Sequence, residues 1–248
     1  MTDGSLPSSA APRRFRPTLW PTVVTVLSLV TLIGLGSWQL QRLVWKTALI
    51  DEIHARQAMA PIPLPATIED PPALRFRKVS VQGTFDHSRE IHLFAHTERG
   101  NLGYQVITPL KQDDGTWVLV NRGWVPDTRK DPATRAEGQV AGPVAITGTA
   151  RPAWQRHMFL PDNDIATNHW FFGDIPAMAA HLGLSVSPVF VEADATANPG
   201  GLPIGGQTPI DDIPNNHLQY ALTWYMLAVA LAGVYFVYHW RRDEPGSA

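Results

Sequence analysis

Two long stretches without a charged side chain constrain the fold of this 248-residue chain more than any other feature. They run over Leu19–Leu40 and Leu218–Tyr238. At ~1.5 Å per residue, each is long enough to cross a hydrocarbon layer ~30 Å thick as a helix. The first is too long for the apolar part of a cleaved signal peptide. We therefore expect two membrane-spanning helices.

Charged residues at the ends of these stretches predict their orientation. Arg241 and Arg242 follow the second stretch, and the acidic pair 211–212 precedes it. Basic residues favour the cytoplasmic side, so both termini are expected in the cytoplasm. Arg42 and Lys46, directly after the first stretch, weaken that half of the argument. The expected location is a bacterial inner membrane, with the central part of the chain in the periplasm.

Between the two spans, the hydrophobic period changes near residue 75 from that of a helix to that of a strand. Seven short strands are expected, over Lys78–Phe85, Glu90–His96, Tyr104–Leu110, Trp117–Asn121, Val144–Ala150, Trp170–Phe172 and Pro188–Glu192. One short helix is expected over Pro176–Leu182, with Asp174 as its N-cap and Gly183 beyond its end. The chain is thus predicted to be an α+β membrane protein. Its two transmembrane helices bracket an antiparallel, β-rich extramembrane sheet or small barrel with one or two short helices.

These patterns divide the chain into five segments. They are a disordered cytoplasmic tail (1–17), a transmembrane helix with a periplasmic extension (18–58), a periplasmic β-rich domain (59–214), a second transmembrane helix (215–240) and a cytoplasmic tail (241–248). Pro61 and the prolines after it are expected to end the first helix. The small residues Gly34, Gly36, Ala228 and Ala232 would allow the two spans to pack closely.

Composition excludes several classes of function. The chain has no cysteine, which excludes disulfides, thiolate metal sites and covalent c-type haem attachment. Its net charge of -2 provides no global attraction for nucleic acid.

His92 and His96 lie on one predicted strand ~13 Å apart, at ~3.3 Å per residue, so they cannot share a metal ion within a straight strand. No nucleophile–base or paired-carboxylate pattern stands out, and we expect no enzyme activity.

One titratable side chain, His217, stands at the start of the second span, where such groups are rare. Asn215 or Asn216 would cap the helix, and Tyr220 and Trp224 recur on the face that carries the histidine. One interpretation is an interfacial histidine that bonds to water or lipid phosphate among ordinary belt aromatics. The other is an axial ligand of a haem iron in an apolar slot. Spacing alone favours the first interpretation.

Arg42 lies just past the first span, at the membrane level of His217 if the two spans pair. Its guanidinium could hold carboxylates such as haem propionates. It could equally be an ordinary membrane anchor whose charged end reaches the interface, which is the commoner role for such a residue.

Six blocks of sequence, in this order and with a span at each end, resemble the Surfeit locus protein 1 family. The blocks are Gly36–Gln39 with Arg42 and Trp45–Lys46, Gly103–Tyr104, Val118–Pro126, Asn168–Trp170, Gly200–Thr208, and Asn216–Ala221 with Thr223–Tyr225. The resemblance extends from about Gly36 to Arg241.

The resemblance implies an assembly factor for cytochrome c oxidase that assists maturation of the catalytic subunit, subunit I. Bacterial members of the family are associated with haem a binding, and the family's haem-linked histidine matches His217. Arg42, Trp224, Tyr220 and Trp38 would surround the cofactor. The glycine of the family's Asn-Arg-Gly block matches position 123, a folding position. Subunit I, haem a synthase and the bilayer would be the partners, without nucleic acid.

Two other functions stay open at this point. The chain could be a stably bound accessory subunit of a haem-copper oxidase with a structural role. It could also be a membrane-anchored periplasmic enzyme that uses His92 and His96 of the predicted sheet.

Overall fold

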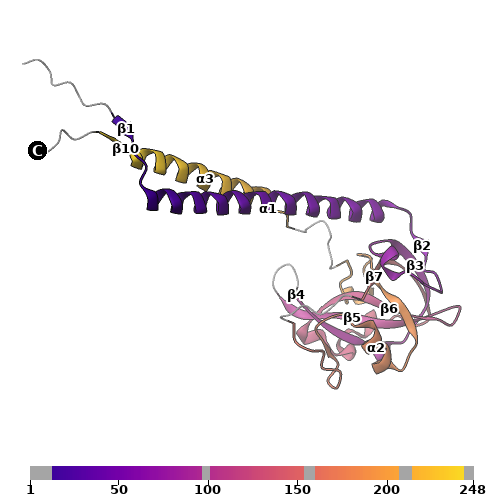
Figure 1. The fold of residues 1–248 in the computed structure, drawn as a ribbon. Coiled ribbons are helices and arrows are strands. Elements are labelled where there is room, and N and C mark those ends of the chain that lie inside the picture. Colours follow the sequence, from indigo (N-terminus) through magenta and orange to yellow (C-terminus); the bar gives the residue numbers. More distant parts are fainter. Residues whose placement is uncertain (1–12, 97–100, 154–159, 207–213, 243–248) are drawn as a thin grey trace, which may run out of the picture. The chain divides into compact units, whose positions relative to one another are not determined.

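The computed structural model describes residues 13–96, 101–153, 160–206 and 214–242 (Figure 1). The chain forms two compact units, one of residues 1–50 with 213–248 and the other of residues 51–212. Most of the predicted tails, and the acidic pair 211–212 used for orientation, lie outside the described residues.

The first unit is an antiparallel pair of helices, α1 (Leu19–Ala58) and α3 (His217–His239). Both are long and apolar enough to cross a membrane. Few residues in the most apolar stretch of either helix are buried within the protein. Helix α1 ends at Ala58, and its last turns belong to the second unit. Proline at position 61 cannot continue a helix, which explains the end of α1.

Small residues line part of the seam between α1 and α3. Ala221 and Ala228 are buried, and a Cβ atom at Gly36 would lie 2.9 Å from the ring of Tyr225. The prediction of close packing is therefore confirmed for Gly36 and Ala228. It is wrong for Gly34, where an added Cβ atom would have no neighbour within 4 Å, and for the exposed Ala232. Both residues turn away from the partner helix.

Polar side chains also join the two helices along much of their length. The pairs are Thr18–His239 (3.1 Å), Thr22–Tyr235 (2.7 Å), Ser37–Tyr225 (3.1 Å), Gln39–His217 (2.6 Å) and Thr47–Asn215 (3.3 Å). In lipid such bonds replace partners that water would otherwise supply, and each contributes roughly 0.6–2 kcal/mol. The helix pair is thus held by small-residue packing together with interhelical hydrogen bonds.

A short ladder joins the two ends of the helix pair that lie nearest the chain termini. Strand β1 (Arg13–Phe15) pairs antiparallel with β10 (Trp240–Arg242). The Phe15 ring stacks on Phe236 at 5.7 Å. Residues 13–15 therefore differ from the disordered tail predicted for 1–17, because they find backbone and aromatic partners at the end of α3.

The second unit is a β-rich domain. Its strands are β2 (Ile62–Pro63), β3 (Lys78–Phe85), β4 (Ile91–His96), β5 (Leu102–Gln112), β6 (Trp117–Pro126), β7 (Pro143–Pro152), β8 (His169–Trp170) and β9 (Val186–Ala193). They form one sheet in the order β2-β3-β7-β9-β6-β5-β4-β8, and β3 also pairs with β5. That extra pairing closes β3, β7, β9, β6 and β5 into a small barrel. The α+β prediction is confirmed, with strand ends shifted by a few residues.

Most neighbouring strands run antiparallel, whereas β2–β3, β4–β8 and β6–β9 run parallel. Helix α2 (Ile175–Leu182) begins at Asp174, whose side chain accepts a hydrogen bond from the Ala177 amide at 3.0 Å. It ends at Gly183, which adopts a left-handed φ of 65°. Short 3-10 turns cover Pro71–Leu74, His87–Arg89, Asp127–Arg129, Pro132–Gly138 and Pro199–Gly201.

Strand β6 runs through the middle of the hydrophobic core. Val118 and Val120 pack inside the barrel with residues of β3, β7 and β9. Leu119 faces a second cluster, which contains Trp170 of β8 and Met178 of α2. All three β6 side chains are fully buried. A strand covered on both faces has a continuous apolar sequence rather than an alternating one. Residues 118–120 form such a continuous apolar run.

We expect a leucine at position 228 to separate the two helices. Ala228→Leu places extra carbons in a seam with no room for them, which should destabilise the pair by about 1–3 kcal/mol. Ala230→Leu is the control, because Ala230 is exposed on the same helix. The stabilities of the two variants are compared by unfolding each purified protein in mixed detergent micelles, with energy transfer between labels on the two helices as the signal. Equal stability of the two variants would contradict the observed seam.

Candidate functional site

His217 is the first residue of α3, directly after the N-cap residue Asn216. The place of the histidine in the first turn is confirmed, and Asn216 occupies the predicted N-cap position, although its side chain makes no capping hydrogen bond. The side chain is half-buried, and its Nδ1 atom lies 2.6 Å from Oε1 of Gln39 on α1. An amide oxygen only accepts hydrogen bonds, so Nδ1 must donate. In a neutral ring the lone pair then lies on Nε2, which is the nitrogen left to ligate a metal.

The other predicted site residues lie within a few turns of this contact. Trp224 is half-buried two turns along α3, and Tyr220 is 54% exposed. On α1, Trp38 is 51% exposed and directly precedes Gln39. These aromatic side chains lie beside the seam, and part of their apolar surface is not covered by other residues of the helix pair.

Arg42 is exposed and lies one helical turn beyond Gln39 on α1. Its guanidinium carbon lies 4.4 Å from the centre of the Trp45 ring, a cation–π contact that orients the charged group. The structure brings Gln39 into direct contact with His217, whereas Arg42 is placed near that contact without being part of it. Sequence analysis missed Gln39 and Trp45 as site residues, although both stand in the first of the six blocks.

These residues fit the chemical needs of a haem. A haem iron takes a neutral imidazole nitrogen, its ring packs on aromatic and aliphatic groups, and its propionates are bound by guanidinium groups. His217 Nε2, the exposed faces of Trp38 and Tyr220, and Arg42 supply these three elements within one region of the helix pair. The fit rests on the donor set and on the exposed apolar surface.

His239, at the other end of α3, shows what a purely structural histidine looks like in this unit. Its Nδ1 donates to the Tyr235 carbonyl at 2.9 Å, and its Nε2 accepts from the Thr18 hydroxyl at 3.1 Å. The residue is 1% exposed, and its ring lies 4.3 Å from that of Tyr235. Both nitrogens are used within the protein, so His239 cannot ligate a metal without losing these bonds.

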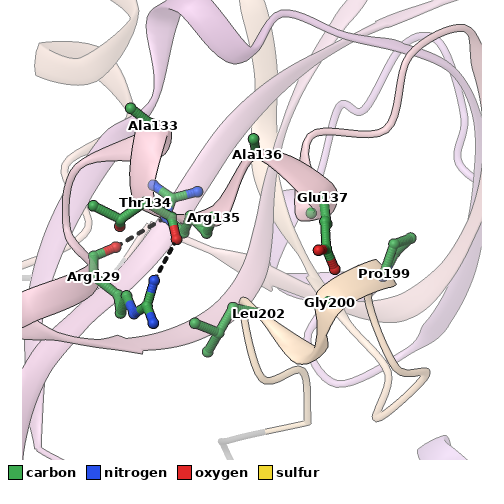
Figure 2. A pocket seen from close by; sticks show the side chains of 10 residues that line it. Arg129, Ala133, Thr134, Arg135, Ala136, Glu137, Pro199, Gly200 and Leu202 are labelled. Carbon is green, nitrogen blue, oxygen red and sulfur yellow. Dashed lines mark hydrogen bonds between the residues drawn. The ribbon is translucent and has the colours of Figure 1, made fainter.

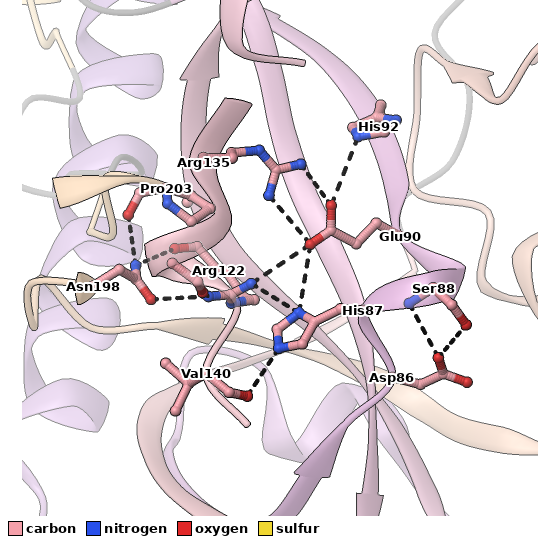
Figure 3. A network of polar contacts seen from close by, with 12 residues as sticks. Asp86, His87, Ser88, Glu90, His92, Arg122, Arg135, Val140, Asn198 and Pro203 are labelled. Carbon is pink, nitrogen blue, oxygen red and sulfur yellow. Dashed lines mark hydrogen bonds and ion pairs between the residues drawn. The ribbon is translucent and has the colours of Figure 1, made fainter. Parts of the chain in front are cut away.

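The β-rich unit contains a separate buried polar network, centred on Glu90 (Figure 3). Arg135 donates to both carboxylate oxygens, at 3.2 and 2.5 Å, and Arg122 lies 3.6 Å away. Burial by itself would raise the pKa of Glu90. Hydrogen bonds from His87 and Arg135, with the charges of Arg135 and Arg122, outweigh burial and lower the pKa to about 2. Glu90 is therefore an ionised structural group at neutral pH.

His92 lies beside this network but is not hydrogen-bonded to it. Its Nδ1 accepts from the Asn168 amide at 3.4 Å, and its Nε2 is buried without a hydrogen-bond partner, 4.0 Å from Glu90. Burial lowers the pKa of His92 to about 4, so the ring is neutral at pH 7. The side chain of His96 lies outside the described residues. Within the described ranges, no group of three metal-ligating side chains occurs.

The Asn-Arg-Gly block of β6 joins this network to the glycine-rich loop. Arg122 donates to the Gly138 carbonyl and, at 3.2 Å, to Oδ1 of Asn198. Gly123 has φ +119°, and a Cβ atom there would lie 2.0 Å from the carbonyl oxygen of Ile204. The backbone angle at Gly123 is thus one that favours glycine, and Arg122 forms a structural ion pair with Glu90. Gln207 and Thr208, the end of the glycine-rich block, lie outside the described residues.

A cavity of about 380 Å³ lies between the turn Pro132–Gly138 and the loop at Gly200 (Figure 2). Arg129 donates to the Thr134 carbonyl at 2.6 Å, and Arg135 Nε donates to the Arg129 carbonyl at 3.1 Å. These guanidinium groups are engaged with the protein's own acceptors. The cavity is therefore a gap between structural turns, and the helix pair remains the stronger candidate site.

Comparison with known proteins agrees with the sequence blocks. The model of the SURF1 family matches residues 26–229. Surfeit locus protein 1 of Mus musculus is 41% identical over 221 residues, which cover 83% of this chain and 71% of that protein. Surfeit locus protein 1 of Takifugu rubripes is 37% identical, covering 83% and 91%. A SURF1-like protein of Drosophila melanogaster is 32% identical, covering 94% and 81%.

The substitution Gly123→Ala should prevent stable folding of the β-rich unit. A methyl group would meet the Ile204 carbonyl and would force a positive φ on alanine, and together these should cost more than about 4 kcal/mol. Gly115→Ala is the matched control, since Gly115 also has a positive φ but nothing within 4 Å. Thermal unfolding of the two full-length variants compares the costs. Similar melting temperatures would show that the contact with Ile204 is unimportant.

The β-rich unit should lose stability as the pH falls from 6.5 towards 4. The pKa of His92 is lowered on folding, so its neutral form stabilises the fold fully above pH 6.5, and this contribution is lost as the pH falls through about 4. The loss should be on the order of 3 kcal/mol. Replacing His92 with phenylalanine should flatten this pH dependence, whereas His181→Gln, at an exposed position, should not. Denaturant unfolding at a series of pH values measures it, and equal slopes in all three proteins would refute it.

Proposed function

The chain belongs to the SURF1 family, and we propose that it is a cytochrome c oxidase assembly factor. Family membership and the geometry around His217 support a role in which it binds haem a at the outer face of the inner membrane and assists its insertion into subunit I. The oxidase role rests on the family resemblance. The haem role is supported by a single observation, the bond at Nδ1 of His217, which puts the lone pair of the neutral ring on Nε2.

The place of the site suits the chemistry of this cargo. Haem a supplies an iron centre on a macrocycle with two propionates and a long isoprenoid tail, and such a molecule partitions into lipid. His217 would hold the iron through Nε2, and Arg42 would hold the propionates. Trp224, Tyr220 and Trp38 would pack against the macrocycle. The apolar surface of the spans would leave the tail in a lipid-like environment.

The same geometry favours transfer over permanent storage. One histidine ligand and a half-open aromatic surface hold a macrocycle less firmly than a buried cage with two histidines. A carrier must bind its cargo with an affinity that the acceptor can exceed, since the acceptor has to shift the equilibrium. Subunit I would be the acceptor, and haem a synthase is a natural donor.

The proposed role is non-enzymatic. In the proposed arrangement the protein spans the bacterial inner membrane twice, with both termini in the cytoplasm and the β-rich unit in the periplasm. The charged residues at the ends of the spans support this orientation. The network around Glu90 serves to hold the β-rich unit together, and its arginines are engaged in structural bonds.

Removal of the proposed iron ligand should abolish most haem binding. In a titration of the detergent-solubilised protein with haem a, His217→Ala should lose the spectrum of histidine ligation and bind at least about tenfold more weakly, a loss of 1.4 kcal/mol or more. His181→Ala, a change at an exposed histidine of the β-rich unit, is the control. An unchanged spectrum and affinity in His217→Ala would exclude this histidine as the ligand.

The cellular role is tested in a strain that lacks this protein. Its cytochrome c oxidase should contain less haem a and have lower activity, and the protein should co-purify with immature subunit I. Normal haem a content would refute the assembly role. Recovery at fixed stoichiometry with mature, active oxidase would instead identify a structural accessory subunit.

A further inference from the structure

We propose that Gln39 is the positioning residue for His217: it holds the imidazole as the Nδ1–H tautomer, so that Nε2 is presented as the metal-binding nitrogen. The identity of the metal rests on the proposed function. The tautomer does not, because it follows from the contact between the two side chains in the protein alone.

The contact itself requires this tautomer. Nδ1 of His217 and Oε1 of Gln39 are 2.6 Å apart, which is short for a hydrogen bond between nitrogen and oxygen. Only the imidazole can donate in this pair, because an amide oxygen has no proton. Where no such partner exists, a neutral histidine exchanges between its two tautomers, and only part of the population has a lone pair on Nε2.

Cross-helix contacts on both sides hold the two residues in register. Deeper in the helix pair, the Ser37 hydroxyl lies 3.1 Å from that of Tyr225, whose ring also packs against Gly36. Towards the other end of the pair, the Asn215 amide donates to the Thr47 hydroxyl at 3.3 Å, and the Lys46 ammonium donates to the carbonyl of residue 214. The contact of Gln39 with His217 lies between these contacts, which keep the two positions opposite each other.

Comparison with His239 shows that the arrangement at His217 is distinctive. Both rings donate from Nδ1 to an oxygen. In His239, however, the Thr18 hydroxyl occupies Nε2, whereas the bond described for His217 engages only Nδ1. Among the described residues, the two histidines of α3 thus share a tautomer but differ in whether the Nε2 lone pair accepts a hydrogen bond from the protein.

A partner on the second nitrogen is how proteins commonly prepare a histidine ligand. A hydrogen bond from the non-ligating N–H fixes the ring orientation and makes the ligating nitrogen more basic, and loss of such a partner typically costs about 10- to 100-fold in metal affinity. Gln39, supplied by α1, would also make ligation depend on the pairing of the two helices. The iron site is then complete only when α1 and α3 are together.

The tautomer is measured without haem, by nitrogen-15 NMR of histidine-labelled, full-length protein in micelles at a pH where imidazole is neutral. The resonances of His217, assigned with His217→Ala, should show Nδ1 protonated in the wild type. Gln39→Met removes the acceptor and should shift the population towards the Nε2–H form. Gln39→Glu keeps an acceptor and should preserve the Nδ1–H form. Gln41→Met, at an exposed position on the same helix, should change nothing.

Haem a titration then tests the consequence for the iron. Gln39→Met should bind haem a about 10- to 100-fold more weakly. Gln39→Glu should retain binding and lower the reduction potential of the bound haem, because a carboxylate acceptor increases the electron density on the imidazole. If the helix pair fails to form in Gln39→Met, the potential and tautomer of Gln39→Glu decide the question.

The outcomes separate this inference from the proposed function. Protonation of Nε2 in the wild type, or an unchanged tautomer and affinity in Gln39→Met, would overturn the role of Gln39 while leaving His217 as a ligand. Haem binding that is insensitive to His217→Ala would overturn the proposed function and the iron-facing role of Nε2. A potential unchanged in Gln39→Glu would show that the contact is structural only.

Discussion

Both units of this protein depend on the rule that a polar group shielded from water must find its partner within the chain. In the helix pair, hydroxyl, amide and imidazole groups of α1 and α3 meet across the seam, and their pairing sets the register of the helices. In the β-rich unit, the Glu90 carboxylate is satisfied by two buried arginines, which also bind carbonyl oxygens of the turns around them. The same requirement also orients His217 and His239 in the helix pair and His87 in the β-rich unit.

Much of the fold could be predicted because it is encoded in local patterns. Strand β3 has the bounds that its alternating sequence predicts, and the cap and end of α2 follow from Asp174 and Gly183. Strand β6 is predicted to end at Asn121, whereas it continues to Pro126. Polar residues at 121 and 122 resemble the end of a strand. They are in fact buried, because Asn121 bonds to Gln105 and Arg122 to the network around Glu90.

Contacts between distant residues account for what sequence analysis missed. Closure of the barrel depends on the pairing of β3 with β5, and no local pattern identifies that partner. At the candidate site, His217 stands out because a titratable group at the start of a span is unusual. Gln39 does not stand out, since a glutamine at a membrane interface is unremarkable until the second helix places an imidazole against it. The residues of the Glu90 network are likewise scattered along the chain, at positions 87, 90, 122 and 135.

Closure of the barrel restricts how a partner protein can approach the β-rich unit. Each strand of the ring pairs with two neighbours. In the described part of the chain the sheet ends at the two-residue strands β2 and β8, which pair with short segments of β3 and β4. Recognition by addition of a foreign strand needs a free, extended edge. Segments as short as β2 and β8 offer such a strand only a few main-chain bonds. A partner protein engaged by this unit would therefore be recognised mainly through side chains and turns rather than by extending the sheet.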